Sequence, residues 1–230
     1  MKDRFILILI LLVYSTTAFS QIITVKQDGS GDFEIIQDAI NASVDGDTVL
    51  VWPGTYLENV DFVGKNISLG SLNLTTGEKN YINETIIDGN QTGSCVKIEN
   101  GETNAILHGF TLINGIGTYV SSFQLAGGGA YLYNSTSSII NCIIRNNIIA
   151  GAGGGIMCRG CVLFISGSTL KNNYAESTGG GISVASGGNV LFDSINLCNI
   201  YLNYSETGND FLKTSQCSTQ NIVVDTFTVL

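Results

Sequence analysis

The sequence predicts an all-β protein, a right-handed parallel β-helix solenoid with a short N-terminal capping helix. Two pairs, Asn146-Asn147 and Asn172-Asn173, are 26 residues apart, and Asn203 follows in a degenerate third copy. The same spacing of 26 residues separates three Gly-Gly-Gly triplets, at 127–129, 153–155 and 179–181. One repeat of this length cannot bury its own apolar face, so successive coils must stack strand upon strand.

Each repeat contains short apolar runs, which are typical of strands and too short for helices. After Gly155 come Ile156–Cys158, Val162–Ile165 and Ser168–Leu170, so we expect three strands per coil and three parallel sheets. The shared spacing places Ile156 between Ala130 and Ile182 on one inward column, because all three follow a Gly triplet. Glycine and asparagine mark the corners, where the backbone needs a positive φ.

The first twenty residues resemble a secretory signal peptide. Lys2 and Arg4 precede an apolar run at 5–14, and Ala18-Phe19-Ser20 is a small-x-small cleavage motif. The run is too short to span a bilayer. We therefore divide the chain into a signal peptide, 1–20, and one β-helix domain, 21–230, in a protein that is secreted or displayed at the cell surface.

The N-terminal elements are predicted in order. Ile22–Val25 is a strand, and 34–42 is a helix whose residues Ile36, Ala39 and Ile40 share one face. Such a helix would cap the open edge of the first coil. A strand at 47–52 follows and ends at Pro53-Gly54.

The middle of the chain continues the strand pattern, whereas residues 115–126 exceed the coil rhythm and are expected to loop out. The remaining candidate strands are 67–69, 85–87, 95–98, 105–112, 222–224 and 226–230. The last of them runs to the final residue with no polar cap, although solenoids need capped ends. This pattern predicts that the chain is truncated or continues in a longer protein.

The N-terminal motifs resemble the cap and first coil of the pectin-lyase-like superfamily of right-handed parallel β-helix proteins, including its secreted bacterial members. The motifs are Asp28–Phe33, Ile36–Ile40, Asp45–Val49 and Pro53–Asn59. With the repeats, the resemblance covers nearly all of the mature chain. It implies a fold and no single activity, because that fold carries lyases, hydrolases, esterases, adhesins and inert stalks.

Catalytic motifs of the resembling enzymes are absent from the sequence. Neither Asp-Phe-Ile-Phe-Gly nor Gly-Arg-Pro-Trp, which the pectinesterase resemblance would require, occurs here. Between 103 and 192 the only acidic residue is Glu176, whereas a hydrolase needs paired carboxylates and a lyase needs acids that hold calcium. His108, the single histidine, has no second ligand or nucleophile nearby. We name no catalytic residue, no metal ligand and no cofactor; calcium enters only under the lyase alternative.

One constellation suggests binding. Arg145 and Lys171 share a repeat position and Tyr201 is the next rung, so the three should stack on adjacent coils; Tyr174 follows Asn173 nearby. A column of basic and aromatic side chains could hold a sugar chain. The alternative, favoured for surface residues of this kind, is a solvated flank without a partner. The repeated asparagines are expected to form a structural ladder of side-chain amides.

The composition limits the classes of partner that we expect this protein to bind. The formal net charge is −9, which disfavours nucleic acid, and no stretch after the signal peptide could span a membrane. Among the six cysteines the only close pair is Cys158 and Cys161, predicted to be a disulfide across a turn or buried thiols. We expect a monomer that meets a polysaccharide or a cell-surface glycan.

The sequence leaves two functions open. The first, which the scarcity of carboxylates favours, is a non-enzymatic β-helix segment for carbohydrate or cell-surface binding. The alternative is the N-terminal part of a polysaccharide lyase or hydrolase whose catalytic residues lie elsewhere.

Overall fold

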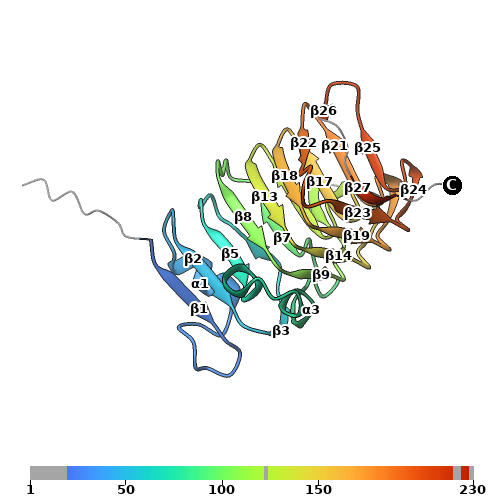
Figure 1. The fold of residues 1–230 in the computed structure, drawn as a ribbon. Helices are drawn as coiled ribbons and strands as arrows, with labels where there is room; N and C mark the ends of the chain where they lie inside the picture. Colours follow the sequence, from blue (N-terminus) through green and yellow to red (C-terminus); the bar gives the residue numbers. More distant parts are fainter. Residues whose placement is uncertain (1–19, 122–123, 220–223, 228–230) are drawn as a thin grey trace, which may run out of the picture.

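The protein is a parallel β-helix in which successive coils stack from the N-terminal to the C-terminal end (Figure 1). The computed structural model describes residues 20–121, 124–219 and 224–227, so the predicted signal peptide lies outside it except for Ser20. Strands form four sheets, named A to D here, and their pairings are parallel except for β10 with β11. The predicted fold class, a parallel β-helix, is confirmed.

Sheets A and B form two sides of the coils. Sheet A contains β1 (Ile22–Val25), β2 (Thr48–Val51), β5 (Ser68–Ser71), β8 (Ala105–His108), β13 (Thr136–Ile140), β18 (Val162–Ser166), β22 (Asn189–Phe192) and β26 (Ser218–Thr219). Sheet B contains β3 (Gly54–Leu57), β6 (Thr85–Asp88), β9 (Thr111–Ile113), β14 (Ile143–Arg145), β19 (Thr169–Lys171), β23 (Cys198–Tyr201) and β27 (Val224–Phe227).

Sheets C and D complete the coils. Sheet C contains β4 (Val60–Asp61), β7 (Val96–Ile98), β12 (Ala130–Tyr133), β17 (Ile156–Arg159), β21 (Ile182–Ala185) and β25 (Phe211–Lys213). Sheet D contains β10 (Thr118–Ser121), β11 (Gln124–Ala126), β15 (Ile148–Ile149), β16 (Gly151–Ala152), β20 (Tyr174–Thr178) and β24 (Tyr204–Thr207).

The repeat register is confirmed. Ile156 pairs with Ala130 on one side and with Ile182 on the other, and all three are buried in the core. Sheets A, B and C each send alternate residues into this core, as the two-residue period of a strand requires.

The expectation of three strands per coil, in three sheets, is wrong for the central coils, whose strands fall in four sheets. The fourth sheet takes β15 and β16 from 148–152 and β20 from 174–178, between each asparagine pair and the next glycine triplet. Gly151 interrupts the first segment and residues 176–178 of the second are polar, so neither contains an apolar run longer than three residues. Pairing with the neighbouring coil, as between Ile148 and Tyr174, satisfies their backbone groups nonetheless.

Two other expectations are corrected. The strand predicted at 105–112 is two strands, β8 and β9, because the chain turns at Gly109, where φ is +80°. The segment expected to loop out forms an antiparallel hairpin of β10 and β11, and β11 joins sheet D beside β16.

The capping helix α1 (Ile36–Ala42) begins two residues later than predicted and packs against β1, β2 and β4. Its N-terminus is held from across the coil, since the Glu58 carboxylate accepts hydrogen bonds from the backbone N–H groups of Ile36 and Gln37, both at 2.9 Å. Two further helices, α2 (Asn73–Thr76) and α3 (Asn80–Glu84), were not predicted. Four and five residues are too few for helical periodicity to show.

The asparagine ladder is confirmed as a buried structural feature. The Asn147 side chain donates from Nδ2 to Asn173 Oδ1, and Asn173 donates likewise to Asn203 Oδ1, each at 2.9 Å. Asn203 Nδ2 in turn donates to Asp210 Oδ1 at 2.9 Å. The residue before each ladder asparagine has a positive φ, as at Asn172, which turns the chain from sheet B into sheet D.

The two predicted states of the close cysteine pair are resolved: Cys158 and Cys161 form a disulfide across the turn between β17 and β18. The other four cysteines, Cys95, Cys142, Cys198 and Cys217, are buried free thiols. Among the described residues, no helix is both long and apolar enough to cross a lipid bilayer.

Candidate functional site

The predicted basic–aromatic column is brought into line by the fold. Arg145 pairs with Lys171, and Lys171 pairs with Tyr201, on three adjacent strands of sheet B. All three are partly exposed, and the Lys171 ammonium lies 5.9 Å from the centre of the Tyr201 ring. Whether the column binds a ligand stays a prediction.

Tyr174 lies on sheet D, separated from the column by the two-residue asparagine turn. It pairs with Tyr204, and their rings stack with centroids 5.5 Å apart and planes at 10°. Because the facing sides of these rings are occupied by each other, the pair presents mainly edges and hydroxyl groups to a ligand that runs along the coils.

A second surface, on the outer face of sheet C, was not predicted. We call it the sheet C strip, and it comprises Asp61, Lys97, Glu99, Tyr131, Tyr133 and Arg159. The register places Tyr131 beside Lys97 and Tyr133 beside Arg159 on neighbouring coils. These side chains point away from the central core, because their strand neighbours Leu132 and Cys158 belong to it. Tyr131 is nonetheless only 3% exposed, because sheet D packs over it.

One end of the strip holds two carboxylates on one amine. The Lys97 ammonium lies 2.7 Å from Asp61 Oδ2 and 2.9 Å from Glu99 Oε1, and all three side chains are partly exposed. Burial lowers the pKa of Lys97, but hydrogen bonds to Asp61 and Glu99 and their negative charge outweigh it, so the pKa is raised overall. Lys97 therefore stays protonated between the two carboxylates.

The other end of the strip is aromatic and basic. The rings of Tyr131 and Tyr133 are stacked with centroids 6.4 Å apart, and the Arg159 guanidinium lies 5.8 Å from the centre of the Tyr133 ring. Burial raises the pKa of Tyr131, while the nearby charge of Arg159 acts in the opposite direction. The Tyr131 hydroxyl thus keeps its proton at neutral pH and remains a hydrogen-bond donor.

Sheet D packs against the outer face of sheet C beside the strip. Ala126 and Ala152 of sheet D form a small apolar cluster with Tyr131 and Met157 of sheet C. The glycine triplets permit this approach. A Cβ atom on Gly153, where φ is +76°, would lie 2.6 Å from the backbone oxygen of Ile156.

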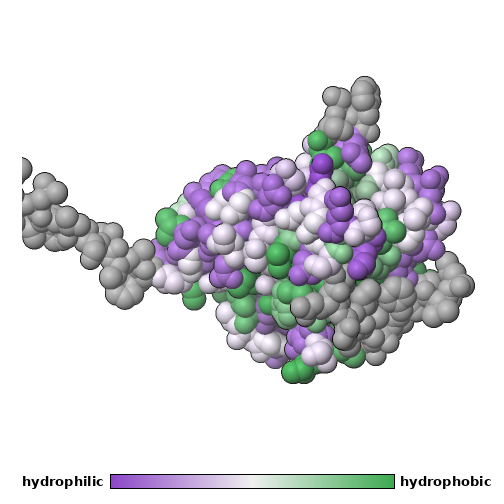
Figure 2. Space-filling model, turned by 90° about the horizontal axis from the view of Figure 1, so that it is seen from above, coloured by the Kyte–Doolittle hydropathy of each residue, from purple (hydrophilic) through white to green (hydrophobic). Residues whose placement is uncertain are grey.

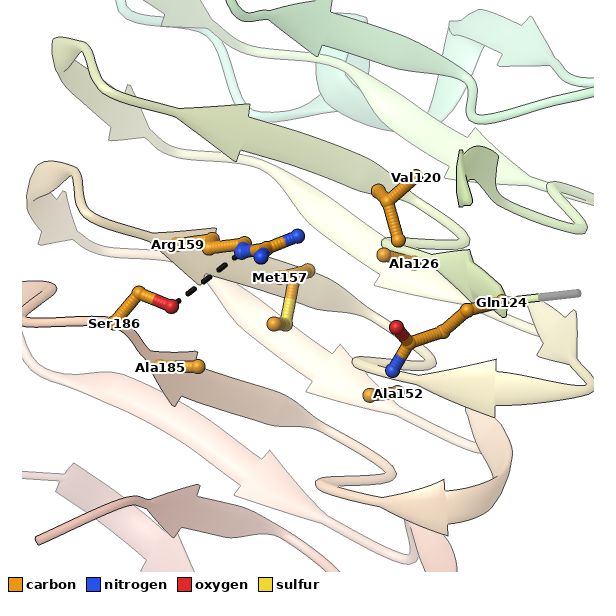
Figure 3. A pocket seen from close by; sticks show the side chains of 8 residues that line it. All are labelled: Val120, Gln124, Ala126, Ala152, Met157, Arg159, Ala185 and Ser186. Carbon is orange, nitrogen blue, oxygen red and sulfur yellow. Dashed lines mark hydrogen bonds between the residues drawn. The ribbon is translucent and has the colours of Figure 1, made fainter. Parts of the chain in front are cut away.

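A pocket of about 190 Å³ opens where the two sheets meet (Figure 3). Arg159 and Ser186 line it on the side of sheet C, and the Arg159 Nε donates to Ser186 Oγ at 3.4 Å. Gln124 lines it from the hairpin of sheet D. The rest of the wall is apolar and consists of Val120, Ala126, Ala152, Met157 and Ala185.

On the molecular face in Figure 2, hydrophilic and hydrophobic residues alternate in small groups.

The side chain of His108 makes polar contacts with two asparagines. Its Nε2 lies 2.9 Å from Asn73 Oδ1, and Asn141 Nδ2 lies 3.3 Å from that same oxygen. Burial lowers the pKa of His108, which keeps the ring neutral at physiological pH.

The period of 26 residues could have revealed a third of the strip. Tyr133 and Arg159 are one repeat apart, and each lies three residues after an inward residue, Ala130 or Ile156, which by strand alternation is an outward position. Asp61, Lys97 and Glu99 precede the regular repeats, so no spacing in the sequence links them to it.

Comparisons with known proteins are limited to structures: no protein-family model matches the chain, and no curated protein matches it. Pectin methylesterase from carrot is 13% identical, with 86% of this chain and 88% of that chain covered and a TM-score of 0.39. The deglycosylated pectin methylesterase from Aspergillus niger is 16% identical, with 92% and 85% covered and a TM-score of 0.40. The likeness concerns the general β-helix architecture, which the sheet topology shows independently, and it assigns no activity.

Proposed function

We propose that this protein is an extracellular polysaccharide-binding β-helix and that the sugar chain lies across successive coils on the sheet C strip. The observation that carries the proposal is the alignment of Tyr133 and Arg159 with the Asp61–Lys97–Glu99 group on one outer face, with the buried Tyr131 stacked against Tyr133. Phenol, guanidinium, ammonium and carboxylate groups at coil spacing offer both donors and acceptors, which hydroxyl-rich ligands require.

The charges of the strip favour a neutral or weakly charged chain. Two acids, Asp61 and Glu99, balance two bases, Lys97 and Arg159, so the strip has no net charge of its own. A protein with a net charge of −9 attracts polyanions poorly at long range. A neutral polysaccharide could also bind at the basic–aromatic column of Arg145, Lys171, Tyr201 and Tyr174.

A second function, cleavage of the bound polysaccharide, is favoured by the Asp61–Lys97–Glu99 group. Two carboxylates that contact one ammonium are close enough to act as a pair, one as an acid and the other as a base or nucleophile. The lysine would have to release at least one of them when the substrate binds. This candidate corresponds to a polysaccharide hydrolase or lyase, and calcium would be involved only in the lyase.

Affinity electrophoresis against a panel of soluble polysaccharides tests the binding proposal. The panel contains xylan, glucomannan, pectin, polygalacturonate and alginate. We expect retardation by at least one neutral polymer, lost in the double variant Tyr133→Ala/Arg159→Ala. The triple variant Arg145→Ala/Lys171→Ala/Tyr201→Ala tests the column, and exposed Lys79→Ala is the control for removal of a positive charge.

The outcomes separate the two surfaces and the two functions. Binding that survives the strip variant but not the column variant moves the site to the column. No retardation by any polymer would overturn the proposal. Release of reducing ends or unsaturated sugars that Glu99→Gln abolishes would establish cleavage.

A further inference from the structure

The pocket between sheets C and D is separate from the charged end of the strip, and its chemistry indicates one class of ligand group. We propose that it receives a neutral acyl substituent, such as an acetyl group, carried by a sugar unit of the bound polysaccharide. The inference rests on the proposed function and specifies its ligand.

The size of the pocket suits a substituent rather than a whole chain. Its volume of about 190 Å³ corresponds to about six water molecules in the liquid. An acetyl group and the ring atoms that carry it fill such a space, whereas the polymer itself would pass outside over Tyr133 and Arg159.

The walls of the pocket are mostly apolar and suit a methyl group. Met157, Ala126 and Ala152 are nearly buried, and Val120 and Ala185 pack against the same cluster. Burial of one methyl group against such walls is favourable, because it removes apolar surface from water.

The polar groups of the pocket suit a carbonyl oxygen. Arg159 has donors in addition to the Nε–H that contacts Ser186, and in Figure 3 its guanidinium extends along the mouth of the pocket near Met157. Gln124 lines the opposite side and can donate from its amide. An acyl group can therefore accept a hydrogen bond at its carbonyl oxygen while its methyl group contacts the apolar wall.

A free carboxylate fits this site less well than an ester or amide. Arg159 supplies one positive charge at the mouth of the pocket, since both acids of the strip contact Lys97 instead. Inside the pocket, however, burying an ionised group against five apolar side chains carries a desolvation penalty that a neutral acyl group avoids.

The test compares each polysaccharide before and after removal of its acyl groups. Acetylated xylan and acetylated glucomannan are used with their alkali-deacetylated forms, and polygalacturonate provides free carboxylates. We expect the protein to bind the acetylated form about tenfold more tightly, which is about 1.4 kcal/mol. Ala185→Leu, which fills the pocket from sheet C, should reduce this ratio to about one while binding to the deacetylated polymer persists.

Two further variants secure the interpretation. Ala150→Leu makes the same substitution on an exposed residue outside the pocket and should keep the tenfold preference. Gln124→Leu removes the amide donor on the side of the pocket away from the strip, and it should also abolish the preference, so the test does not depend on the folding of one variant.

Each result decides the matter. Equal binding of acetylated and deacetylated polymers overturns the acyl pocket and leaves polysaccharide binding intact. Tighter binding of polygalacturonate that Ala185→Leu removes also overturns it, in favour of a carboxylate. No binding of any polymer overturns the proposed function and the pocket with it.

Discussion

Asn147 donates a hydrogen bond from its side chain to the side chain of Asn173 on the next coil, at 2.9 Å, and both residues are fully buried. The same oxygen of Asn173 also accepts from the backbone N–H of Asn147, at 3.2 Å. The side-chain oxygens of Asn173 and Asn203 therefore each accept a hydrogen bond from a backbone N–H group at the corner of the preceding coil. Since buried polar groups are costly when unpaired, the ladder ties the coils into one cooperative unit.

Replacing Asn173 by alanine should destabilise the protein by about 2–4 kcal/mol. The change removes the oxygen that accepts from both the backbone N–H and the side-chain amide of Asn147, and it removes one of the two donors to Asn203 Oδ1, all in the interior. Urea denaturation followed by circular dichroism measures the loss. Exposed Asn80→Ala is the matched control and should change the free energy of unfolding by less than about 0.5 kcal/mol. Equal losses for the two variants would contradict a ladder that contributes to stability.

Leu202→Asn should stabilise the protein by about 1 kcal/mol. Leu202 has φ of +56° at the corner where Asn146 and Asn172 have φ of +56° and +55°. Asparagine tolerates this left-handed conformation better than leucine, and Leu202 is 61% exposed, so little packing is lost. The melting temperature reports the gain.

The reverse change, Asn172→Leu, provides the matched test of that backbone argument. It puts leucine into an equivalent left-handed corner one coil earlier and should destabilise by a similar amount. A gain from both substitutions, or a loss from both, would show that packing rather than φ decides these positions.

The core register predicts a large contrast between inward and outward residues. Ile156 is fully buried between two coils, so Ile156→Ala should cost about 2–5 kcal/mol. Lys171→Ala, on the outer face of sheet B, should change the free energy of unfolding by less than about 0.5 kcal/mol. Thermal unfolding of both variants measures the difference, and similar losses would argue against the register.

Stability should fall as the pH drops below the ordinary His108 pKa of 6.5. Burial lowers the pKa of His108 in the folded protein, so the unfolded chain binds a proton there first. Its contribution is fully present above pH 6.5 and is lost as the pH falls toward the folded pKa.

The difference between wild type and His108→Gln isolates this effect, because His108 is the only histidine in the chain. Denaturation midpoints between pH 7.5 and 5.5 should converge for the two proteins as the pH falls. A constant difference across that range would mean that His108 does not titrate differently in the folded and unfolded states.

Removal of divalent cations should leave polysaccharide binding unchanged. Lys97 and Arg159 supply positive charge on the sheet C strip, so no bridging cation is needed there. Retardation in affinity gels with EDTA and with added calcium checks this. A requirement for calcium would favour the lyase alternative over simple binding.

The sequence by itself determined the features that repeat from coil to coil. A constant period forces equivalent residues into register, because stacked strands keep one spacing along the whole solenoid. The column of Ala130, Ile156 and Ile182 and the amide ladder of Asn147 and Asn173 follow directly from it. The alignment of Arg145 with Lys171 follows for the same reason.

Only the tertiary structure decided where side chains from different parts of a coil meet. The helices α2 and α3 are too short to show a helical period in the sequence. The strands of sheet D follow from backbone pairing with the neighbouring coil, not from a long apolar run. Asp61, Lys97 and Glu99 come from irregular early coils, and they meet because β4 and β7 are neighbours in sheet C. The pocket between sheets C and D needs the chain to turn from sheet D into sheet C at Gly153. Periodicity fixes which residues stack, but the path of the chain between strands fixes which surfaces face each other.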